Sequence, residues 1–240
     1  MNRATRHVSG IKYNRNAKIS IVILTAGEGN RMKSHGPRSL IRLTPEQNLI
    51  TYQVDMLNKH FPNNEIILVC GHDAEKVMNN SPNSIIKIHN EKYEENNVVR
   101  SIGLGLRACT TERVLIIYGD LLFNNATFDN IILEDSTLLL EKEGLFSESS
   151  VGCTYDENQY AEQLLYDLPN KWVQIAFFTK KELSLLKTTV WNREKDKLFG
   201  FEAINEIINK NGRIKTLIPK NMKIIDIDSS KDLAYISQII

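Results

Sequence analysis

ISIVIL at residues 19–24 runs directly into TAGEGNRM at 25–32, and PRSL follows at 37–40. The first segment is short, apolar and rich in β-branched residues, a pattern typical of a strand buried on both faces. The small residues and two glycines after it allow a tight turn whose backbone N–H groups can face a ligand. The sequence therefore predicts a buried strand that ends in a glycine-rich loop.

Apolar runs alternate with helical patterns through the rest of the first half of the chain. Strands are predicted at 65–70, 84–89 and 113–118, and helices at 45–60, 73–80 and 97–109. Alternation of this kind is typical of a parallel sheet with helices on both faces. We therefore predict an α/β fold of the Rossmann-like, three-layer kind with a mostly parallel sheet.

The second half is predicted to complete the same domain, which spans residues 19–240. Strands are expected at 172–179, 214–218 and 223–228, and helices at 181–188, 199–211 and 230–240. In residues 121–171 the alternation of strand and helix patterns is weaker. Strand patterns occur at 137–140 and 151–155, and connections are expected at 141–150 and 156–171. We expect this region to be a small substrate-side insertion or lid. Residues 1–18 are basic, contain no acidic residue and are predicted to form a flexible tail.

The bulk composition is that of an ordinary soluble globular protein, with 42% apolar and 25% charged residues among 240. The formal net charge of +1 excludes a strongly basic surface for coating nucleic acid. Cys70, Cys109 and Cys153 form no Cys-x-x-Cys pair and are predicted to be free thiols. Without a spanning apolar run or a signal peptide, we expect a cytoplasmic protein with no nucleic-acid or membrane partner.

The glycine-rich loop is expected to bind phosphate. Ligands of such sheets bind at the carboxyl ends of the strands, which places on one edge the loops after Leu24, Cys70, His89 and Tyr118. Arg31 adds a cation that can hold a phosphate in two places. The loop is not of the Walker type, because no Gly-Lys-Ser/Thr follows the glycines. It also lacks the full dinucleotide fingerprint, since Met32 stands at the place of the third glycine.

Three aspartates occupy positions suited to a divalent cation. Asp120 follows an apolar strand, so its carboxylate is expected to project into the cleft. Asp226 and Asp228 lie two residues apart and are predicted to share one face of a strand. Magnesium prefers oxygen ligands and commonly uses one or two carboxylates plus substrate phosphates. A structural alternative is that Asp228 caps the last helix.

Residues 24–32 and 37–40 together resemble the signature of nucleotidyltransferases with the sugar-nucleotide-synthase type of fold. In that family Leu-Ala-Ala-Gly-x-Gly-x-Arg-Met leads to Pro-Lys-x-Leu. Here Thr25 stands in place of an alanine, and Arg38 in place of the lysine that contacts the triphosphate or the acceptor phosphate. Arginine keeps the charge but presents a planar fork instead of a compact ammonium group.

The resemblance implies a fold of the nucleotide-diphospho-sugar transferase type and a role for each matching residue. It implies that Mg²⁺ is held by Asp120 and Asp228, with Asp226 as a further candidate. It implies that the nucleotide is bound by Leu24, Thr25, Ala26, Gly27, Glu28, Gly29 and Arg31, and that the catalytic residues are Arg31, Arg38, Asp120 and Asp228.

Two further segments resemble the nucleotide side of the site. Asn96, Asn97 and Ser101 match the Asn-Asn-x-x-x-Ser segment of cytidylyltransferases that activate phosphocholine and similar phospho-alcohols. Gly71 and His72 resemble the loop that follows the second strand in the family. The structural alternatives are an ordinary helix cap at Asn96 or Asn97 and a surface histidine at His72.

The predicted reaction is transfer of a nucleoside monophosphate, CMP from CTP in the first instance, to phosphocholine or a related phospho-alcohol. The first alternative is a sugar 1-phosphate acceptor with UTP, GTP or dTTP. The second, which rests on Arg38 alone, is a catalytically silent nucleotide-binding regulatory domain. Four aromatic residues could surround a choline-like cation but are expected to be core or surface residues instead: Trp172, Trp191, Tyr155 and Tyr160.

Overall fold

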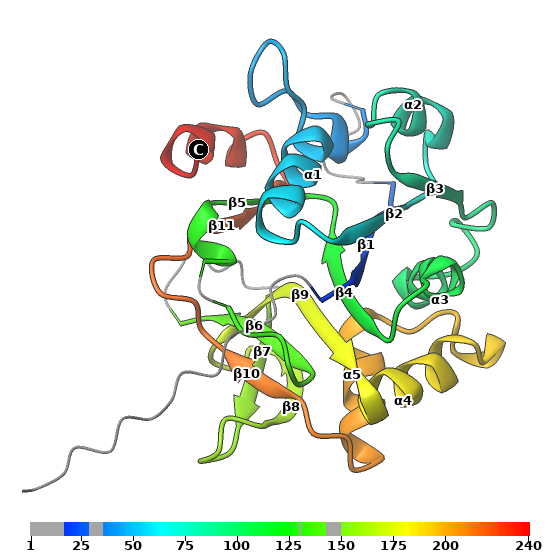
Figure 1. The fold of residues 1–240 in the computed structure, drawn as a ribbon, viewed down its shortest axis with the longest axis vertical. Helices are drawn as coiled ribbons and strands as arrows, with labels where there is room; N and C mark the ends of the chain where they lie inside the picture. Colours follow the sequence, from blue (N-terminus) through cyan, green and yellow to red (C-terminus); the bar gives the residue numbers. More distant parts are fainter. Residues whose placement is uncertain (1–16, 29–35, 130, 143–149) are drawn as a thin grey trace, which may run out of the picture.

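The central sheet runs in the order β10-β6-β9-β4-β1-β2-β3 in a computed structural model that describes residues 17–28, 36–129, 131–142 and 150–240 (Figure 1). Its strands are β1 (Ile19–Thr25), β2 (Asn64–Cys70), β3 (Ile86–His89), β4 (Arg113–Tyr118), β6 (Thr137–Glu141), β9 (Lys171–Thr179) and β10 (Lys215–Leu217). A hairpin of β7 (Val151–Tyr155) and β8 (Ala161–Tyr166) joins it at β9, and β5 (Leu121–Phe123) pairs separately with β11 (Ile224–Asp226).

Strand β1 lies in the middle of a parallel segment, because both β2 and β4 pair with it in parallel. Strand β3 extends this segment in parallel, whereas β9 runs antiparallel to both β4 and β6. Parallel strands bring their carboxyl ends to one edge of the sheet. The predicted mostly parallel α/β sheet is therefore confirmed.

Helices cover both faces of this sheet. The α-helices of the described residues are α1 (Leu49–His60), α2 (Ala74–Asn79), α3 (Val98–Ala108), α4 (Lys180–Val190) and α5 (Gly200–Asn209). Short 3-10 helices form at η2 (Arg38–Leu40), η3 (Asn125–Thr127), η4 (Arg193–Lys195) and η5 (Asp232–Gln238). Figure 1 shows α1 and α2 on one side of the strands and α3, α4 and α5 on the other.

Side chains of β1 alternate between two apolar cores, as a strand buried on both faces requires. Ile21 and Ile23 pack with residues of α1 and α2. Val22 and Leu24 pack with residues of α3, α4 and α5. The expected three-layer arrangement follows directly from this alternation.

Helix α1 begins four residues later than the sequence suggested, and α3 begins one residue later. Helix α1 begins at Leu49 and not near Pro45, because the Asn48 side chain accepts a hydrogen bond from Thr51 N at 2.9 Å and caps the helix. Helix α3 begins at Val98, with Asn97 as its cap. Caps of this kind contribute about 1 kcal/mol each.

The region 121–171 is more regular than its sequence pattern predicted. Strand β6 lies inside the central sheet between β10 and β9, and β8 occupies residues that we expected to be a connection. The β7–β8 hairpin is the part that leaves the sheet. A lid function for this region stays a prediction.

The end of the chain differs from the expected strand and helix. Strand β11 ends at Asp226, so Asp228 lies beyond the strand and not on its face. The closing helix is a 3-10 helix, η5, that begins at Asp232. Cys70, Cys109 and Cys153 are free, as predicted.

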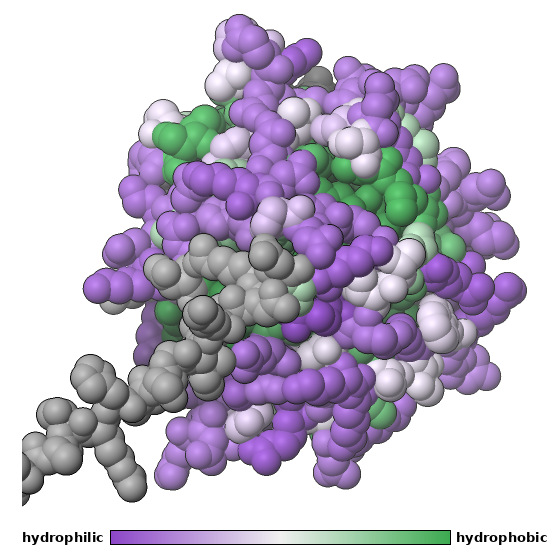
Figure 2. Space-filling model, in the orientation of Figure 1, coloured by the Kyte–Doolittle hydropathy of each residue, from purple (hydrophilic) through white to green (hydrophobic). Residues whose placement is uncertain are grey.

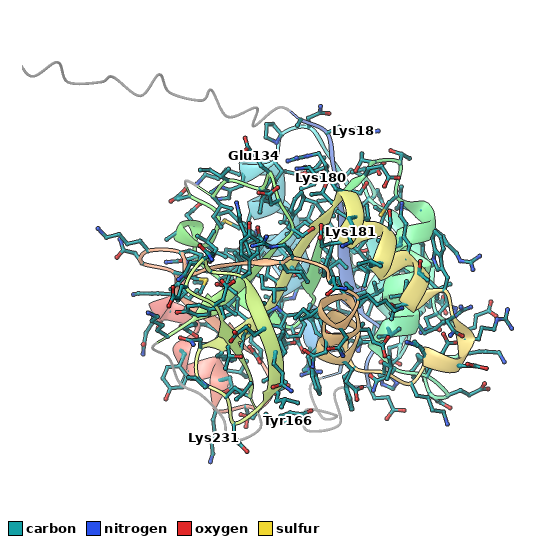
Figure 3. The ribbon with its side chains drawn as sticks, turned by 90° about the horizontal axis from the view of Figure 1, so that it is seen from below. Lys18, Glu134, Tyr166, Lys180, Lys181 and Lys231 are labelled. Atoms are coloured by element: carbon teal, nitrogen blue, oxygen red, sulfur yellow. The ribbon has the colours of Figure 1, made fainter. Side chains whose placement is uncertain are left out.

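The surface on the face shown in Figure 2 is mostly hydrophilic, with smaller hydrophobic areas between the charged side chains. Figure 3 shows Lys18, Lys180 and Lys181 at the end where β1 begins, and Lys231 near the opposite end. None of the helices in the described part of the chain has the length and apolarity to cross a membrane. Of the predicted basic tail, residues 1–16 lie outside the described residues.

Candidate active site

A cleft of about 240 Å³ opens at the carboxyl ends of β1, β3 and β4. Its walls contain nine of the residues that the sequence singled out: Leu24, Thr25, Ala26, Gly27, Arg38, Asn96, Asn97, Ser101 and Asp120. Other residues also line it, among them Pro37 and Ser39 of the signature segment, Asn90, Tyr93 and Val98 around the Asn96–Asn97 segment, and Tyr118. The edge predicted from the strand order is thus the edge that carries the cleft.

Hydrogen bonds hold the backbone of the turn that carries Asp120. Gly119 N donates to Leu24 O at 2.8 Å, and Ile227 N donates to Asp120 O at 2.9 Å. The buried Gln53 side chain of α1 donates to the carbonyls on either side of the turn, Tyr118 O at 3.1 Å and Leu121 O at 2.7 Å. The turn that presents Asp120 is therefore held by the sheet, by α1 and by the segment after β11.

Arg38 joins two of the predicted metal ligands. Its Nη1 lies 2.9 Å from Asp120 Oδ2 and also donates a hydrogen bond to Asp228 Oδ1. The backbone N–H groups of Asp228 and Ser229 donate to Asp232 Oδ2, so Asp232 holds the start of the last helix. The side chain of Asp228 therefore faces Arg38, and the structural alternative of a helix cap at Asp228 is wrong.

Asp226 has different partners from Asp228. Its Oδ1 lies 3.2 Å from Lys171 Nζ, and its Oδ2 accepts a hydrogen bond from Gln174 Nε2 at 2.8 Å. The prediction that the two aspartates share a strand face is wrong, because β11 ends between them and turns the chain. Lys171 and Gln174 were not predicted, and nothing in their local sequence pattern indicates this contact.

The carboxyl of Asp120 is in an unusual electrostatic setting. Burial is the main cause that raises its pKa to about 6; Arg38 opposes the shift, and Asp226 and Asp228 add to it. Its Oδ1 is buried and has no hydrogen-bond partner among the described residues. A buried carboxylate oxygen without a partner is costly unless a ligand satisfies it.

The donor set fits a magnesium ion that completes its coordination with substrate. Asp120 and Asp228 supply carboxylate oxygens, and Oδ1 of Asp120 is available for a cation. Within the described residues no group of three or more His, Cys, Asp or Glu side chains converges as a metal site. Mg²⁺ needs only one or two carboxylates when phosphates and water provide its other ligands.

Gly27 and Gly71 shape the nucleotide side of the cleft in opposite ways. A Cβ at Gly27 would meet no atom of the described residues within 4 Å, so it would border space that they leave open. A Cβ at Gly71 would lie 2.5 Å from Ala26 O and 2.6 Å from the Tyr93 Cβ, so only glycine allows these segments to approach.

The remaining loop residues are placed as follows. His72 N donates to Ala26 O at 3.1 Å, and the His72 ring contacts Tyr93 at the cleft wall. Neither Gly71 nor His72 lines the cleft directly, and Glu28 does not line it either. The predicted residues Gly29 and Arg31 lie outside the described residues.

Asn96, Asn97 and Ser101 form one wall of the cleft, which we call the amide-rich wall, and Asn90 holds part of it through hydrogen bonds. Its buried side chain donates from Nδ2 to Asn96 Oδ1 at 3.0 Å and to Ser101 Oγ at 3.1 Å. The Asn97 side chain accepts from Val98 N at 2.8 Å, which is the ordinary helix cap that we held as the alternative. Asn90 directly follows β3, so the strand-end rule could have identified it.

Comparison with known proteins agrees with this geometry. The sequence profile of the MobA-like NTP transferase domain matches residues 21–137, which include most of β1, all of β2 to β5 and the residues of the cleft wall. The protein is an enzyme of the nucleotidyltransferase type, as the sequence predicted.

Solved structures are similar in fold to nearly the whole chain. CTP:phosphocholine cytidylyltransferase from Streptococcus pneumoniae is 20% identical with a TM-score of 0.73, over 92% of this chain and 98% of that one. The inositol-1-phosphate CTP transferase from T. maritima is 20% identical with a TM-score of 0.74, over 91% and 95%. A nucleoside-diphosphate-sugar pyrophosphorylase from Vibrio cholerae is 15% identical with a TM-score of 0.67, over 91% and 99%.

These structural similarities establish the fold, which is that of the nucleotide-diphospho-sugar transferases. No curated protein sequence matches the chain.

Proposed function

We propose that this enzyme transfers a nucleoside monophosphate, CMP from CTP in the first instance, to a small phosphorylated acceptor and releases pyrophosphate. The observation that carries the proposal is the contact of Arg38 with Asp120 and Asp228 at the glycine-loop cleft. A cation and two carboxylates beside open backbone are the groups that a triphosphate and its metal ion require.

The chemistry needs positioning more than it needs proton transfer. A phosphate oxygen of the acceptor forms a bond to the α-phosphorus of the NTP, and the bond from that phosphorus to the bridging oxygen of the β-phosphate breaks. Pyrophosphate leaves with the electron pair. Because the acceptor phosphate is already ionised at neutral pH, no general base is required, and catalysis comes from alignment and charge stabilisation.

The residues of the cleft have separate tasks in this proposal. The backbone from Leu24 to Gly27 faces the triphosphate, and Arg38 moves from the carboxylates to the phosphates when substrate binds. Asp120 and Asp228 hold magnesium, which when bound neutralises charge on the phosphates. Arg31 is proposed to add a second cation on the strength of the sequence resemblance alone.

The amide-rich wall is proposed to receive the base and ribose. Asn96, Asn97 and Ser101 line the cleft, and the buried Asn90 is hydrogen-bonded to Asn96 and Ser101. Amide and hydroxyl groups both donate and accept hydrogen bonds, so they suit the polar edge of a pyrimidine. CTP is favoured because two similar structures, from S. pneumoniae and T. maritima, are CTP-dependent transferases.

The acceptor is proposed to be a phospho-alcohol such as phosphocholine or a related compound. The alternative is a sugar 1-phosphate with UTP, GTP or dTTP, which the similarity to a nucleoside-diphosphate-sugar pyrophosphorylase supports. Pyrophosphate release with magnesium, each NTP in turn, and a panel of phospho-alcohols and sugar 1-phosphates tests the proposal. Release that depends on both substrates supports it, and release that is unchanged in Asp120→Ala contradicts the roles of the carboxylates.

A further inference from the structure

Ser39 places a buried hydroxyl in the wall of the cleft. The residue is 4% exposed and lines the cleft next to Arg38. Its Oγ is buried and has no hydrogen-bond partner among the described residues. A buried hydroxyl without a partner costs the folded protein stability, so such groups are few and commonly mark a ligand. The position therefore points to a ligand of the cleft.

The family signature does not account for a serine at this position. In Pro-Lys-x-Leu the residue between the cation and the leucine is unspecified, and in this chain it is Ser39. Packing does not require the hydroxyl either, because alanine would fill nearly the same space without burying a polar atom. The serine is thus a feature of this chain that needs its own explanation.

The turn that carries Ser39 is firmly held. Ser39 is the middle residue of η2, in which Leu40 N donates to Pro37 O at 2.9 Å and Ile41 N donates to Arg38 O at 3.1 Å. The side chain of Leu40 packs on the core beneath α1 and α2, and that of Ile41 packs with residues of α1 and β5. Because the turn is anchored on both sides, the hydroxyl stays at the cleft wall.

Ser39 lies on the side of the cleft where charge is concentrated. Arg38 precedes it, and Arg38 Nη1 lies 2.9 Å from Asp120 Oδ2. Among the described residues that line the cleft, Ser39 Oγ and Asp120 Oδ1 are the two buried side-chain oxygens without a hydrogen-bond partner. The two oxygens suit different partners, since a carboxylate oxygen can bind a cation whereas a hydroxyl can donate to an anion.

The base and the ribose are proposed to lie at another wall. The amide-rich wall follows β3 at the end of the sheet, and β2 and β1 separate β3 from β4, after which Asp120 lies. Ser39 instead adjoins Arg38, the residue that is proposed to move to the phosphates. A hydroxyl that donates to a charged phosphate oxygen forms a stronger hydrogen bond than one between neutral groups.

We propose that Ser39 Oγ donates a hydrogen bond to a non-bridging oxygen of the triphosphate, so that Ser39 is a substrate-binding residue beside Arg38. The proposal rests on the proposed function and adds a residue to its triphosphate site. In this arrangement the hydroxyl destabilises the free protein and stabilises the complex. Its removal should therefore make the free protein more stable and the complex weaker.

Ser39→Ala removes the hydroxyl, and two other variants are its controls. Thr189 in α4 is 1% exposed, and its Oγ1 is also buried without a partner among the described residues, but Thr189 does not line the cleft. Thr189→Val keeps the shape of that side chain and removes its hydroxyl. Ser136→Ala removes a buried hydroxyl that is in use, because Ser136 Oγ accepts from Thr179 N at 3.0 Å and donates to Thr179 O at 3.2 Å.

Three quantities are measured for each variant: the unfolding temperature without ligand, the calorimetric affinity for magnesium complexes of α,β-methylene NTP analogues and of tripolyphosphate, and the affinity for Mn²⁺ alone. Tripolyphosphate has the phosphates without base or ribose. In Ser39→Ala we expect the Kd of tripolyphosphate and of the best-bound NTP analogue to rise about tenfold. Both Kd values should be unchanged in the two controls.

The unfolding temperatures should separate the three hydroxyls. Loss of an unused buried hydroxyl should raise the unfolding temperature by about 2–4 °C in Ser39→Ala and in Thr189→Val. Loss of a hydroxyl with partners should lower it in Ser136→Ala. Affinity for Mn²⁺ without nucleotide should be the same in Ser39→Ala as in the wild type.

The proposal is overturned if Ser39→Ala binds tripolyphosphate and the NTP analogue as tightly as the wild type does. A lower unfolding temperature in Ser39→Ala would also overturn it, because the hydroxyl would then have a partner inside the protein. Weaker Mn²⁺ binding would assign the hydroxyl to the metal ion instead.

Parallel pyrophosphate release separates this result from the proposed function. Phosphate binding that depends on Ser39, together with no acceptor-dependent pyrophosphate release, would support the contact and contradict the reaction. A wild type that binds neither an NTP analogue nor tripolyphosphate would contradict both.

Discussion

Nη1 of Arg38 lies 2.9 Å from Asp120 Oδ2, and the same nitrogen donates to Asp228 Oδ1. One guanidinium nitrogen therefore occupies the place between two carboxylates where a metal ion would be expected. Arg38 compensates the charge of the two carboxylates, and a metal ion held by them, as proposed above, would have to displace it. This relationship explains how two aspartates can stay close together in a partly buried site.

Replacing Arg38 should separate its effect on the metal from its effect on the nucleotide. Arg38→Gln removes the competing cation, so Mn²⁺ should bind about tenfold more tightly in the absence of nucleotide. The NTP should bind more weakly, because a phosphate-binding cation is lost. Electron paramagnetic resonance of Mn²⁺ and calorimetry of the NTP measure the two effects.

Arg38→Lys is the control, since it keeps the charge and restores the lysine of the family signature. Its Mn²⁺ affinity without nucleotide should stay near that of the wild type. Weaker Mn²⁺ binding in Arg38→Gln would mean that Arg38 supports the metal site instead of occupying it.

Asp120→Asn should stabilise the protein at neutral pH while it removes activity. Burial raises the pKa of Asp120 to about 6 in the folded protein, above its value in the unfolded chain. The folded state therefore holds a proton over roughly pH 4 to 6 that the unfolded state has lost, so this group lowers stability as pH rises through that window.

The comparison of Asp120→Asn with the wild type therefore depends on pH. At pH 8 the variant should be more stable by at most about 3 kcal/mol, and at pH 3.5 the difference should largely vanish. Urea unfolding at both pH values measures it. A variant that is less stable than the wild type at pH 8 would show that the Arg38 contact outweighs the cost of burial.

Gly71→Ala should lower the stability of the protein, whereas Gly27→Ala should lower its affinity for the NTP. An added methyl at Gly71 would collide with Ala26 O at 2.5 Å, so this variant should lose about 1–3 kcal/mol of stability. An added methyl at Gly27 meets no atom of the residues that the structure describes within 4 Å, so the unfolding temperature should be unchanged. It would lie where the triphosphate is proposed to bind, so NTP affinity should fall. Equal NTP affinity in Gly27→Ala and the wild type would move the phosphates away from this part of the loop.

Gln53→Leu should reduce turnover from a position outside the cleft. It removes the hydrogen bonds to Tyr118 O and Leu121 O, and leaving such buried carbonyls without partners costs about 1–3 kcal/mol each. The looser turn should misplace Asp120, so kcat falls while KM for the NTP changes little. Gln163→Leu on the exposed face of β8 is the control. A kcat for Gln53→Leu that equals that of Gln163→Leu would mean that Asp120 is positioned without Gln53.

The sequence predicted the sheet because its signals are local. The β-branched run at 19–24 and the glycine loop after it require a buried strand and a turn, and the strand ends then share one edge. Asp120 could be predicted from the same rule, because it lies two residues after the end of β4.

The contact between Gln174 and Asp226 could not be predicted because it depends on tertiary structure. Gln174 reaches Asp226 only through a bulge in β9, and a bulge leaves no period in the sequence. The positions of Asp226 and Asp228 were predicted incorrectly for a related reason, since the strand was expected to continue to Asp228 and in fact ends at Asp226. The sequence predicts that helix α1 begins at Pro45, whereas it begins at Leu49 because Asn48 caps it.

The most direct test of the account is magnesium-dependent pyrophosphate release by the wild type and by Asp120→Ala, with each NTP and a panel of phosphorylated alcohols and sugars. We predict release only when an NTP and an acceptor are both present, and loss of that release in Asp120→Ala with the fold intact by circular dichroism. Wild-type rates in Asp120→Ala, or no acceptor-dependent release from a wild type that binds NTP, would contradict the account.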